Sequence, residues 1–181
     1  AAPADYLTGI ADGVKGMKFA LPKEFLSEAL APDIAAALRH TADRLTALGA
    51  TVEEVTMPEL DKALPAYYVI SSAEASSNLA RFDGVKYGFR AQNFTDIHSL
   101  YKETRSQGFG AEVKRRILLG SYVLSAGYYD AYYKKALEVR ALIKAAFDKV
   151  FEQYDAVLSP VAPTTAYKLG EKVDDPLAMY L

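Results

Sequence analysis

MKFALP at Met17–Pro22 and TVEEVTMP at Thr51–Pro58 are two short runs of apolar or β-branched residues, each closed by a proline. We predict strands over residues 17–21 and 51–57, because proline ends a buried strand. Between them, residues 32–48 carry apolar side chains at spacings of three and four, with a proline in the first turn and Gly49 as a stop. A strand, a helix and a strand in this order predict a parallel pair joined by a right-handed crossover.

The middle of the chain is rich in aromatic residues and predicts helices separated by Gly and Asp. The predicted helices cover residues 66–79, 96–106, 111–125 and 128–153. AVLS before Pro160 predicts a third strand over about 156–160, and a Pro/Thr/Gly-rich loop follows it. The expected fold class is therefore α/β, rich in helices and with a few short strands, and residues 1–181 are expected to form a single segment.

The composition is that of a globular protein. Of 181 residues, 51% are hydrophobic and 24% are charged, so the composition indicates neither a disordered nor a fibrous chain. With 21 basic and 23 acidic residues the net charge is -2, so the chain as a whole has no electrostatic reason to bind nucleic acid or a membrane directly. No apolar run approaches the roughly 18 residues of a membrane span, and no secretory signal is visible.

Motif searching finds no complete catalytic centre. The absence of cysteine excludes disulfides, thiolate metal sites and cysteine nucleophiles, and it fits the cytosol. His40 and His98 lie in different predicted helices without a partner motif, and no G-x-S-x-G elbow exists. Gly108–Gly110 lacks the third glycine of a dinucleotide loop. Ser99–Lys102 matches S-x-x-K without the accompanying motifs of penicillin-binding enzymes, so we interpret it as chance.

Two features leave a structural and a functional interpretation open. The cluster Lys114-Arg115-Arg116 is typical of a solvated helix turn, but one arginine turned inward would bind a carboxylate bidentately. Tyrosine is frequent, with 13 residues and doublets at 67–68, 128–129 and 132–133. A spacing of four places 128 beside 132 and 129 beside 133 on one helix. Most of these rings are expected to pack, and one or two are candidates for lining a polar pocket.

Three strings of the sequence are highly distinctive. They are YYVISSAEASSNLARFDGVKYGFR at Tyr67–Arg90, SQGFGAEVKRRILLGSYVLSAGYYDAYYKKA at Ser106–Ala136, and YDAVLSPVAPTTAYKLGEKVDDPLAMY at Tyr154–Tyr180. Together they closely resemble the family of A subunits of bacterial glutamyl-tRNA(Gln) and aspartyl-tRNA(Asn) amidotransferases, which are amidase-signature enzymes. The resemblance runs from about Val14 to the end, and it implies a C-terminal-side portion of an α/β/α layered domain.

The resemblance implies a function in protein biosynthesis. A subunits of this family release ammonia from glutamine and pass it to a partner subunit, which amidates a phosphate-activated Glu-tRNA(Gln) or Asp-tRNA(Asn). The implied partners are glutamine, amidotransferase subunits B and C, and tRNA indirectly through the complex. The A subunit is expected to need no cofactor, whereas the partner subunit uses ATP and Mg. The expected location is the cytoplasm, without a membrane.

The resemblance also implies where the chemistry lies. The family uses a serine nucleophile, a second serine in an unusual cis peptide and a buried lysine, which lie upstream of the matched region. This sequence contains no corresponding Gly/Ser-rich stretch, so no catalytic residue is assigned, and the chain alone is expected to be inactive. By resemblance, Arg116 faces the glutamine and Tyr67 lines the same pocket. A family aspartate that holds the glutamine amino group falls just beyond DPLAMY.

Two alternatives remain beside a partial glutaminase subunit. In the first alternative, the chain is a non-catalytic interaction module for subunits B and C. In the second, it is part of another amidase-signature enzyme that hydrolyses a different amide. The strings SQGFG and KRR match the tRNA amidotransferase pattern better than that of a general amidase.

Overall fold

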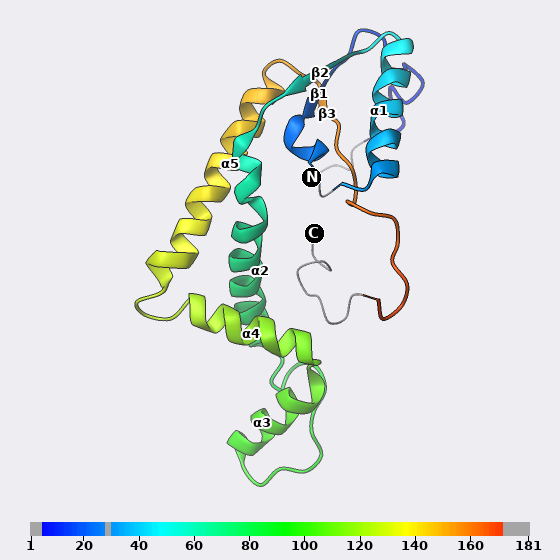
Figure 1. The fold of residues 1–181 in the computed structure, drawn as a ribbon. Coiled ribbons are helices and arrows are strands. Elements are labelled where there is room, and N and C mark those ends of the chain that lie inside the picture. Colours follow the sequence, from blue (N-terminus) through cyan, green and yellow to red (C-terminus); the bar gives the residue numbers. More distant parts are fainter. Residues whose placement is uncertain (1–4, 28–29, 172–181) are drawn as a thin grey trace. The chain divides into compact units, whose positions relative to one another are not determined.

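A computed structural model describes residues 5–27 and 30–171 of the chain. Within these residues the chain forms two compact units. One unit contains the residues up to Leu60 together with those from Ala145 onward, and the other is Asp61–Lys144. The fold is α/β and rich in helices, as predicted, with one small parallel sheet in the first unit (Figure 1). That residues 1–181 form one segment of a single domain stays a prediction.

The first unit is organised by a three-stranded parallel sheet. Its strands are β1 (Lys18–Pro22), β2 (Thr51–Val55) and β3 (Ala156–Val157), in the order β2-β1-β3. Phe19 of β1 is in register with Val52 on one side and with Ala156 on the other. The helix α1 (Pro32–Ala47) connects β1 to β2, so the predicted strand, helix and strand with parallel pairing are confirmed.

Two of the strands end earlier than predicted. The amide of Leu158 still donates to the Ala20 carbonyl at 2.8 Å, but Pro160 has no N–H with which to continue the ladder, and β3 has only two residues. At the end of β2, the amide of the buried Met57 donates to the Glu24 carboxylate at 2.9 Å instead of to a neighbouring strand. Glu24 lies in the 3₁₀ turn η1 (Lys23–Leu26) that follows β1.

Two residues before β3 fasten this strand to its neighbours. Asp155 donates its amide to the Lys18 carbonyl at 2.9 Å, and its carboxylate accepts the Lys18 amide at 2.8 Å. The Tyr154 hydroxyl donates to the Glu53 carboxylate of β2 at 2.7 Å, and this hydrogen bond raises the pKa of Tyr154. Side chains from one short segment thus bind both the central strand β1 and the outer strand β2.

The second unit is helical. After the 3₁₀ turn η2 (Pro58–Lys62) come α2, α3 and α4, then the π-helical turn η3, and α5 begins within this unit. Their bounds are Ala63–Leu79 for α2, Ile97–Gly108 for α3, Ala111–Val123 for α4, Tyr129–Lys134 for η3 and Lys135–Phe151 for α5. The predicted helix over 128–153 is therefore α-helical only from Lys135. None of the described helices is both long and apolar enough to cross a membrane.

The helices α2 and α4 pack against each other, and α3 is attached through a buried hydroxyl. The Ser76 hydroxyl of α2 lies 3.0 Å from the Ser121 hydroxyl of α4. Thr104 of α3 is buried and accepts the amide of Ala91, from the loop before α3, at 3.1 Å. A hydrogen bond between hydroxyl groups thus joins α4 to α2, and a buried hydrogen bond joins α3 to the loop that precedes it.

Candidate functional site

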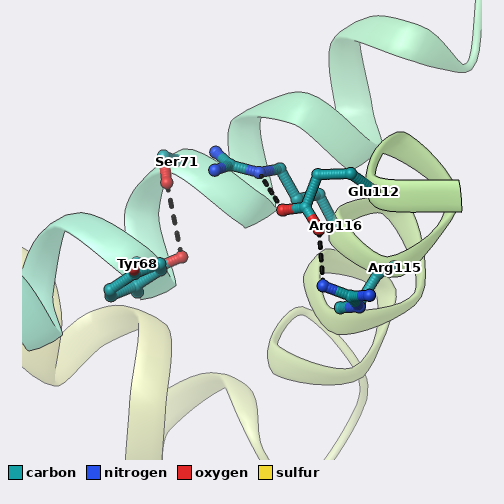
Figure 2. A network of polar contacts seen from close by, with 5 residues as sticks. All are labelled: Tyr68, Ser71, Glu112, Arg115 and Arg116. Carbon is teal, nitrogen blue, oxygen red and sulfur yellow. Dashed lines mark hydrogen bonds and ion pairs between the residues drawn. The ribbon is translucent and has the colours of Figure 1, made fainter. Parts of the chain in front are cut away.

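Arg116 lies on α4 and is the more buried of the two arginines in the basic cluster. Its side chain is 24% exposed, whereas that of Arg115 is 64% exposed. The Arg116 Nε donates to the Glu112 Oε1 at 3.0 Å. Figure 2 shows the Arg116 side chain reaching past the Glu112 carboxylate, away from Arg115. The two arginines thus differ in exposure although they are neighbours in the sequence.

The Glu112 carboxylate accepts a hydrogen bond from each of the two arginines. Its Oε2 accepts from Arg115 NH1 at 2.6 Å, while its Oε1 accepts from Arg116 (Figure 2). Glu112 is the acidic residue in the first turn of α4, where the unpaired backbone N–H groups and the helix dipole favour a negative charge. Residues three and four apart on a helix are neighbours, which accounts for both ion pairs.

Tyr67 lies on α2 and lines a cavity whose lining does not include Arg116. Its ring is half exposed and lies 5.7 Å from the Tyr68 ring, with the planes inclined by 59°. Beside Tyr67 is a cavity of about 340 Å³ between α2 and α5. The cavity is lined by Ala63, Ala66, Tyr67, Ile70, Ser71, Arg140 and Ile143. Among the described residues Arg140, and not Arg116, supplies the cation at this cavity.

The cavity combines an apolar wall with a few polar groups. Ala66, Ile70 and Ile143 provide the apolar surface, and the Ser71 hydroxyl donates only a long hydrogen bond, of 3.5 Å, to the Tyr68 carbonyl. A concave apolar surface with a small number of polar groups is the usual form of a small-molecule site. The arrangement can accommodate an aliphatic chain with an anionic group. The roles of Tyr67 and Arg116 in binding a substrate stay predictions.

A group of tyrosines surrounds the π-helical turn. The rings of Tyr122 and Tyr128 lie 4.3 Å apart, and Tyr132 lies 6.1 and 6.0 Å from them. A hydrogen bond with Tyr128 raises the pKa of Tyr122 to about 12. The predicted neighbours 128 and 132 are confirmed, as are Tyr129 and Tyr133 at 5.3 Å. These rings are partly exposed, and the contacts among them are mainly structural.

No metal centre is found in the part of the chain that the structure describes. Within residues 5–27 and 30–171, no group of three or more His, Cys, Asp or Glu side chains could hold a metal ion. The candidate site is formed by side chains of three helices: Tyr67 from α2, Glu112 and Arg116 from α4, and Arg140 from the beginning of α5.

Comparison with known protein families assigns the fold. The family model described as Amidase matches residues 3–181. The chain belongs to the amidase family. The resemblance that the three distinctive strings carry is thereby confirmed at the level of the family.

Two relatives of this amidase chain share most of its sequence. It is 58% identical to the A subunit of glutamyl-tRNA(Gln) amidotransferase from Agathobacter rectalis over 97% of the chain and 35% of the relative. It is 55% identical to the protein of the same name from Desulforamulus reducens over 98% of the chain and 36% of the relative. The chain thus spans about a third of the length of these relatives.

A solved structure of the same kind supports the assignment to the amidase fold. The crystal structure of the A subunit of glutamyl-tRNA(Gln) amidotransferase from Thermotoga maritima matches with a TM-score of 0.69 and 38% identity. The match covers 98% of this chain and 34% of that structure. The small parallel sheet and the helices of this amidase chain therefore correspond to part of a larger amidase domain.

Sequence reasoning overlooked three residues of the candidate site in this amidase chain. Glu112 precedes Arg115 and Arg116 by three and four residues, and this helical spacing was sufficient to predict both ion pairs. Ser71 follows Tyr67 by one helical turn, so the same rule places it on the same face. Arg140 carried no such signal, because it reaches the cavity only through the packing of α5 beside α2.

Proposed function

We propose that this chain is the substrate-side part of the glutamine-hydrolysing A subunit of a tRNA-dependent amidotransferase. The complete protein would release ammonia from glutamine for the amidation of Glu-tRNA(Gln) or Asp-tRNA(Asn). The observation that carries the proposal is an identity of 58% and 55% to proteins named as the A subunit of glutamyl-tRNA(Gln) amidotransferase, over almost the whole chain. The three distinctive strings that first indicated this family lie within the matched residues.

In the proposed site, Arg116 binds the carboxylate of glutamine and Tyr67 forms part of the wall around the bound molecule, although Arg116 is not among the residues that line the cavity beside Tyr67 in this chain alone. A guanidinium suits this role because its planar fork binds a carboxylate with two parallel hydrogen bonds. The limited exposure of Arg116, at 24%, supports the assignment, since partial burial strengthens a charge-assisted hydrogen bond. Tyr67 is half exposed, which leaves its ring accessible to a bound molecule.

The proposed partners and cofactors follow from the same assignment. The complete protein would assemble with subunits B and C in the cytoplasm and would meet tRNA only through the complex. It would need no cofactor, because the partner subunit uses ATP and Mg to activate the acyl group. The net charge of -2 gives these 181 residues no electrostatic reason to bind the phosphate backbone directly, which agrees with an indirect contact for this part of the protein.

The proposal is tested with the complete protein in its complex with subunits B and C. Ammonia release is measured over a range of glutamine concentrations, and amidation is measured with each misacylated tRNA. We expect Arg116→Ala to raise the KM for glutamine by about 100-fold, the effect of losing a bidentate charged contact. Arg115→Ala is the matched control, because the neighbouring guanidinium is mostly exposed. An unchanged KM in Arg116→Ala would remove Arg116 from the site.

The chain by itself provides a second test. Residues 1–181 alone are expected to release no ammonia from glutamine above background, because loss of a serine nucleophile alone costs on the order of a millionfold in a serine hydrolase. Turnover of glutamine by the isolated chain would contradict the assignment of the catalytic residues to another part of the protein.

An interaction module without catalytic activity is the second candidate function. Leu118 of α4 is 72% exposed, and Leu119 and Tyr122 on the same helix are also exposed. Exposed apolar and aromatic side chains on one helix favour contact with another protein surface. A binding assay between this chain and subunits B and C tests this function, and the lack of a complex at micromolar concentration would count against it.

A further inference from the structure

We propose that Glu112 is a positioning residue, which holds the guanidinium of Arg116 in the orientation that binds the substrate carboxylate. This inference rests on the proposed function, because it requires Arg116 to bind substrate. It adds a residue to the site and assigns it a role in the affinity for glutamine. Three features of the second unit support it. Glu112 binds the Nε atom of Arg116, Glu112 lies in the first turn of α4, and Arg115 is more exposed than Arg116.

The contact with Glu112 is made through the Nε of Arg116. The Nε to Oε1 distance is 3.0 Å. A guanidinium is planar and rigid, so a hydrogen bond at Nε fixes both the direction of the side chain and the plane of the group. The fork formed by the two terminal nitrogens is the edge that pairs bidentately with a carboxylate. A contact at Nε therefore orients the plane of the guanidinium and, with it, the direction of the fork.

Glu112 is itself held in place by two features of α4. Its Oε2 accepts from Arg115 NH1 at 2.6 Å, so both oxygens of the carboxylate have a cationic donor. It also lies in the first turn of a helix of 13 residues, where the helix dipole stabilises a negative charge. A site residue supported from a helix is positioned more precisely than one supported from a loop. Glu112 thus has the fixed geometry that a positioning residue needs.

The two arginines bound to Glu112 differ in a way that assigns their roles. Arg115 is 64% exposed and projects into solvent, whereas Arg116 is 24% exposed. Both ion pairs lie within one turn of a single helix and share Glu112, which is 44% exposed, so each contributes little to folding stability. Ordering a flexible side chain in advance does lower the cost of binding a ligand. We therefore expect the contribution of Glu112 to appear in substrate affinity and not in stability.

The negative charge of Glu112 acts against the binding of glutamine, whereas its positioning of Arg116 favours it. A carboxylate beside Arg116 repels the carboxylate of the substrate and competes for the same cation. If competition dominated, removal of Glu112 would lower the KM, whereas loss of positioning raises it. The sign of the change in KM therefore distinguishes a positioning residue from a competitor.

The test uses the complete protein in its complex with subunits B and C, with ammonia release from glutamine as the assay. We expect Glu112→Ala to raise the KM by about 2- to 10-fold, the range that corresponds to the ordering of one long side chain. The kcat should change by less than about 2-fold, because the reacting atoms are not touched. Arg115→Ala should raise the KM by less than Glu112→Ala, since it removes one of the two supports of Glu112 and keeps the contact with Arg116.

A double-mutant cycle shows whether Glu112 acts through Arg116. In the Arg116→Ala background, Glu112→Ala should raise the KM no further, because the group that it positions is absent. An equal rise in both backgrounds would overturn the inference, and so would an unchanged or lowered KM in the single variant. Glu112→Gln keeps the shape of the side chain and one acceptor oxygen, so it should raise the KM by less than Glu112→Ala and serves if the alanine variant does not fold.

The failure of this inference differs from the failure of the proposed function. If Arg116→Ala leaves the KM unchanged, Arg116 does not bind glutamine and both proposals fail. If Arg116→Ala raises the KM strongly while Glu112→Ala does not, the proposed function stands and the role of Glu112 is rejected.

Discussion

Gly120 of α4 lies so close to α2 that a Cβ at this position would be 2.0 Å from the carbonyl oxygen of Ser72. The same Cβ would be 2.6 Å from the Cβ of Ser76. Glycine inside a helix normally weakens it relative to alanine. Here its lack of a side chain allows the two backbones to approach each other, and this contact keeps the helix with Arg116 beside the helix with Tyr67.

Gly120→Ala should destabilise the protein. The added methyl group meets backbone atoms of α2 that cannot rotate away, so the helices must separate, at a cost of about 1–3 kcal/mol. Denaturant unfolding followed by circular dichroism measures the change. Gly110→Ser is the matched control, because a Cβ at Gly110 has no atom within 4 Å and serine is a good residue before a helix. Equal stability of the Gly120→Ala variant and the wild type would contradict the close approach.

Thr104→Val should also destabilise the protein, through a single hydrogen bond. The Thr104 side chain is 3% exposed, and its hydroxyl accepts the amide of the buried Ala91 at 3.1 Å. Valine has the same shape but leaves that amide without an acceptor, which costs about 1–3 kcal/mol. Thermal unfolding measures the loss. Thr104→Ser retains the hydroxyl and should preserve more of the stability than valine, and the reverse order would show that packing and not the hydrogen bond is decisive.

The start of α3 should depend on pH through Asp96. Its carboxylate accepts the amide of Ser99 at 2.8 Å, and this hydrogen bond lowers the pKa of Asp96 below 3.8. Because the pKa is lower in the folded state, the carboxylate contributes stability above pH 3.8, and the contribution is lost as the pH falls through the lowered pKa. Wild type and Asp96→Ala should therefore differ at neutral pH and converge in acid. A difference that is constant from neutral pH into strong acid would contradict this account.

Tyr122 should ionise later than an ordinary tyrosine. Its hydrogen bond with Tyr128 raises the pKa to about 12 from 10.0. The protonated form is favoured in the folded state, so its contribution to stability is complete below pH 10.0 and is lost as the pH rises towards 12. Ultraviolet titration of the wild type against Tyr122→Phe isolates its signal. Tyr128→Phe should bring the titration back towards the usual range, and no shift in that variant would exclude Tyr128 as the cause.

Local patterns were sufficient to predict the parallel pair β1 and β2 with α1 between them. The strand β1 ends at Pro22, and the helix has a proline at its start and a glycine after its end, so these boundaries have a chemical signal in the sequence, whereas β2 ends at Val55, before its proline. The shortness of β3 follows from the single missing N–H of Pro160, which limits the ladder although the preceding residues favour a strand. The error there concerned the length of the strand and not its place.

The π-helical turn and the cavity beside Tyr67 could not be predicted in the same way. A spacing of four places Tyr128 beside Tyr132 in a regular helix, and the two rings also meet across the wider turn of η3. The sequence pattern therefore did not separate the two geometries. Arg140 reaches the cavity only because α5 runs along α2, which is a matter of tertiary packing.

The hydrogen bond from Lys18 to Asp155 joins residues that are 137 positions apart. During synthesis, β1 and β2 are available to pair long before β3 has left the ribosome. One edge of the central strand therefore stays open while the whole of the helical second unit is being made. An open strand edge readily pairs with another chain, so we expect this interval to be the period in which the nascent protein most needs protection from aggregation.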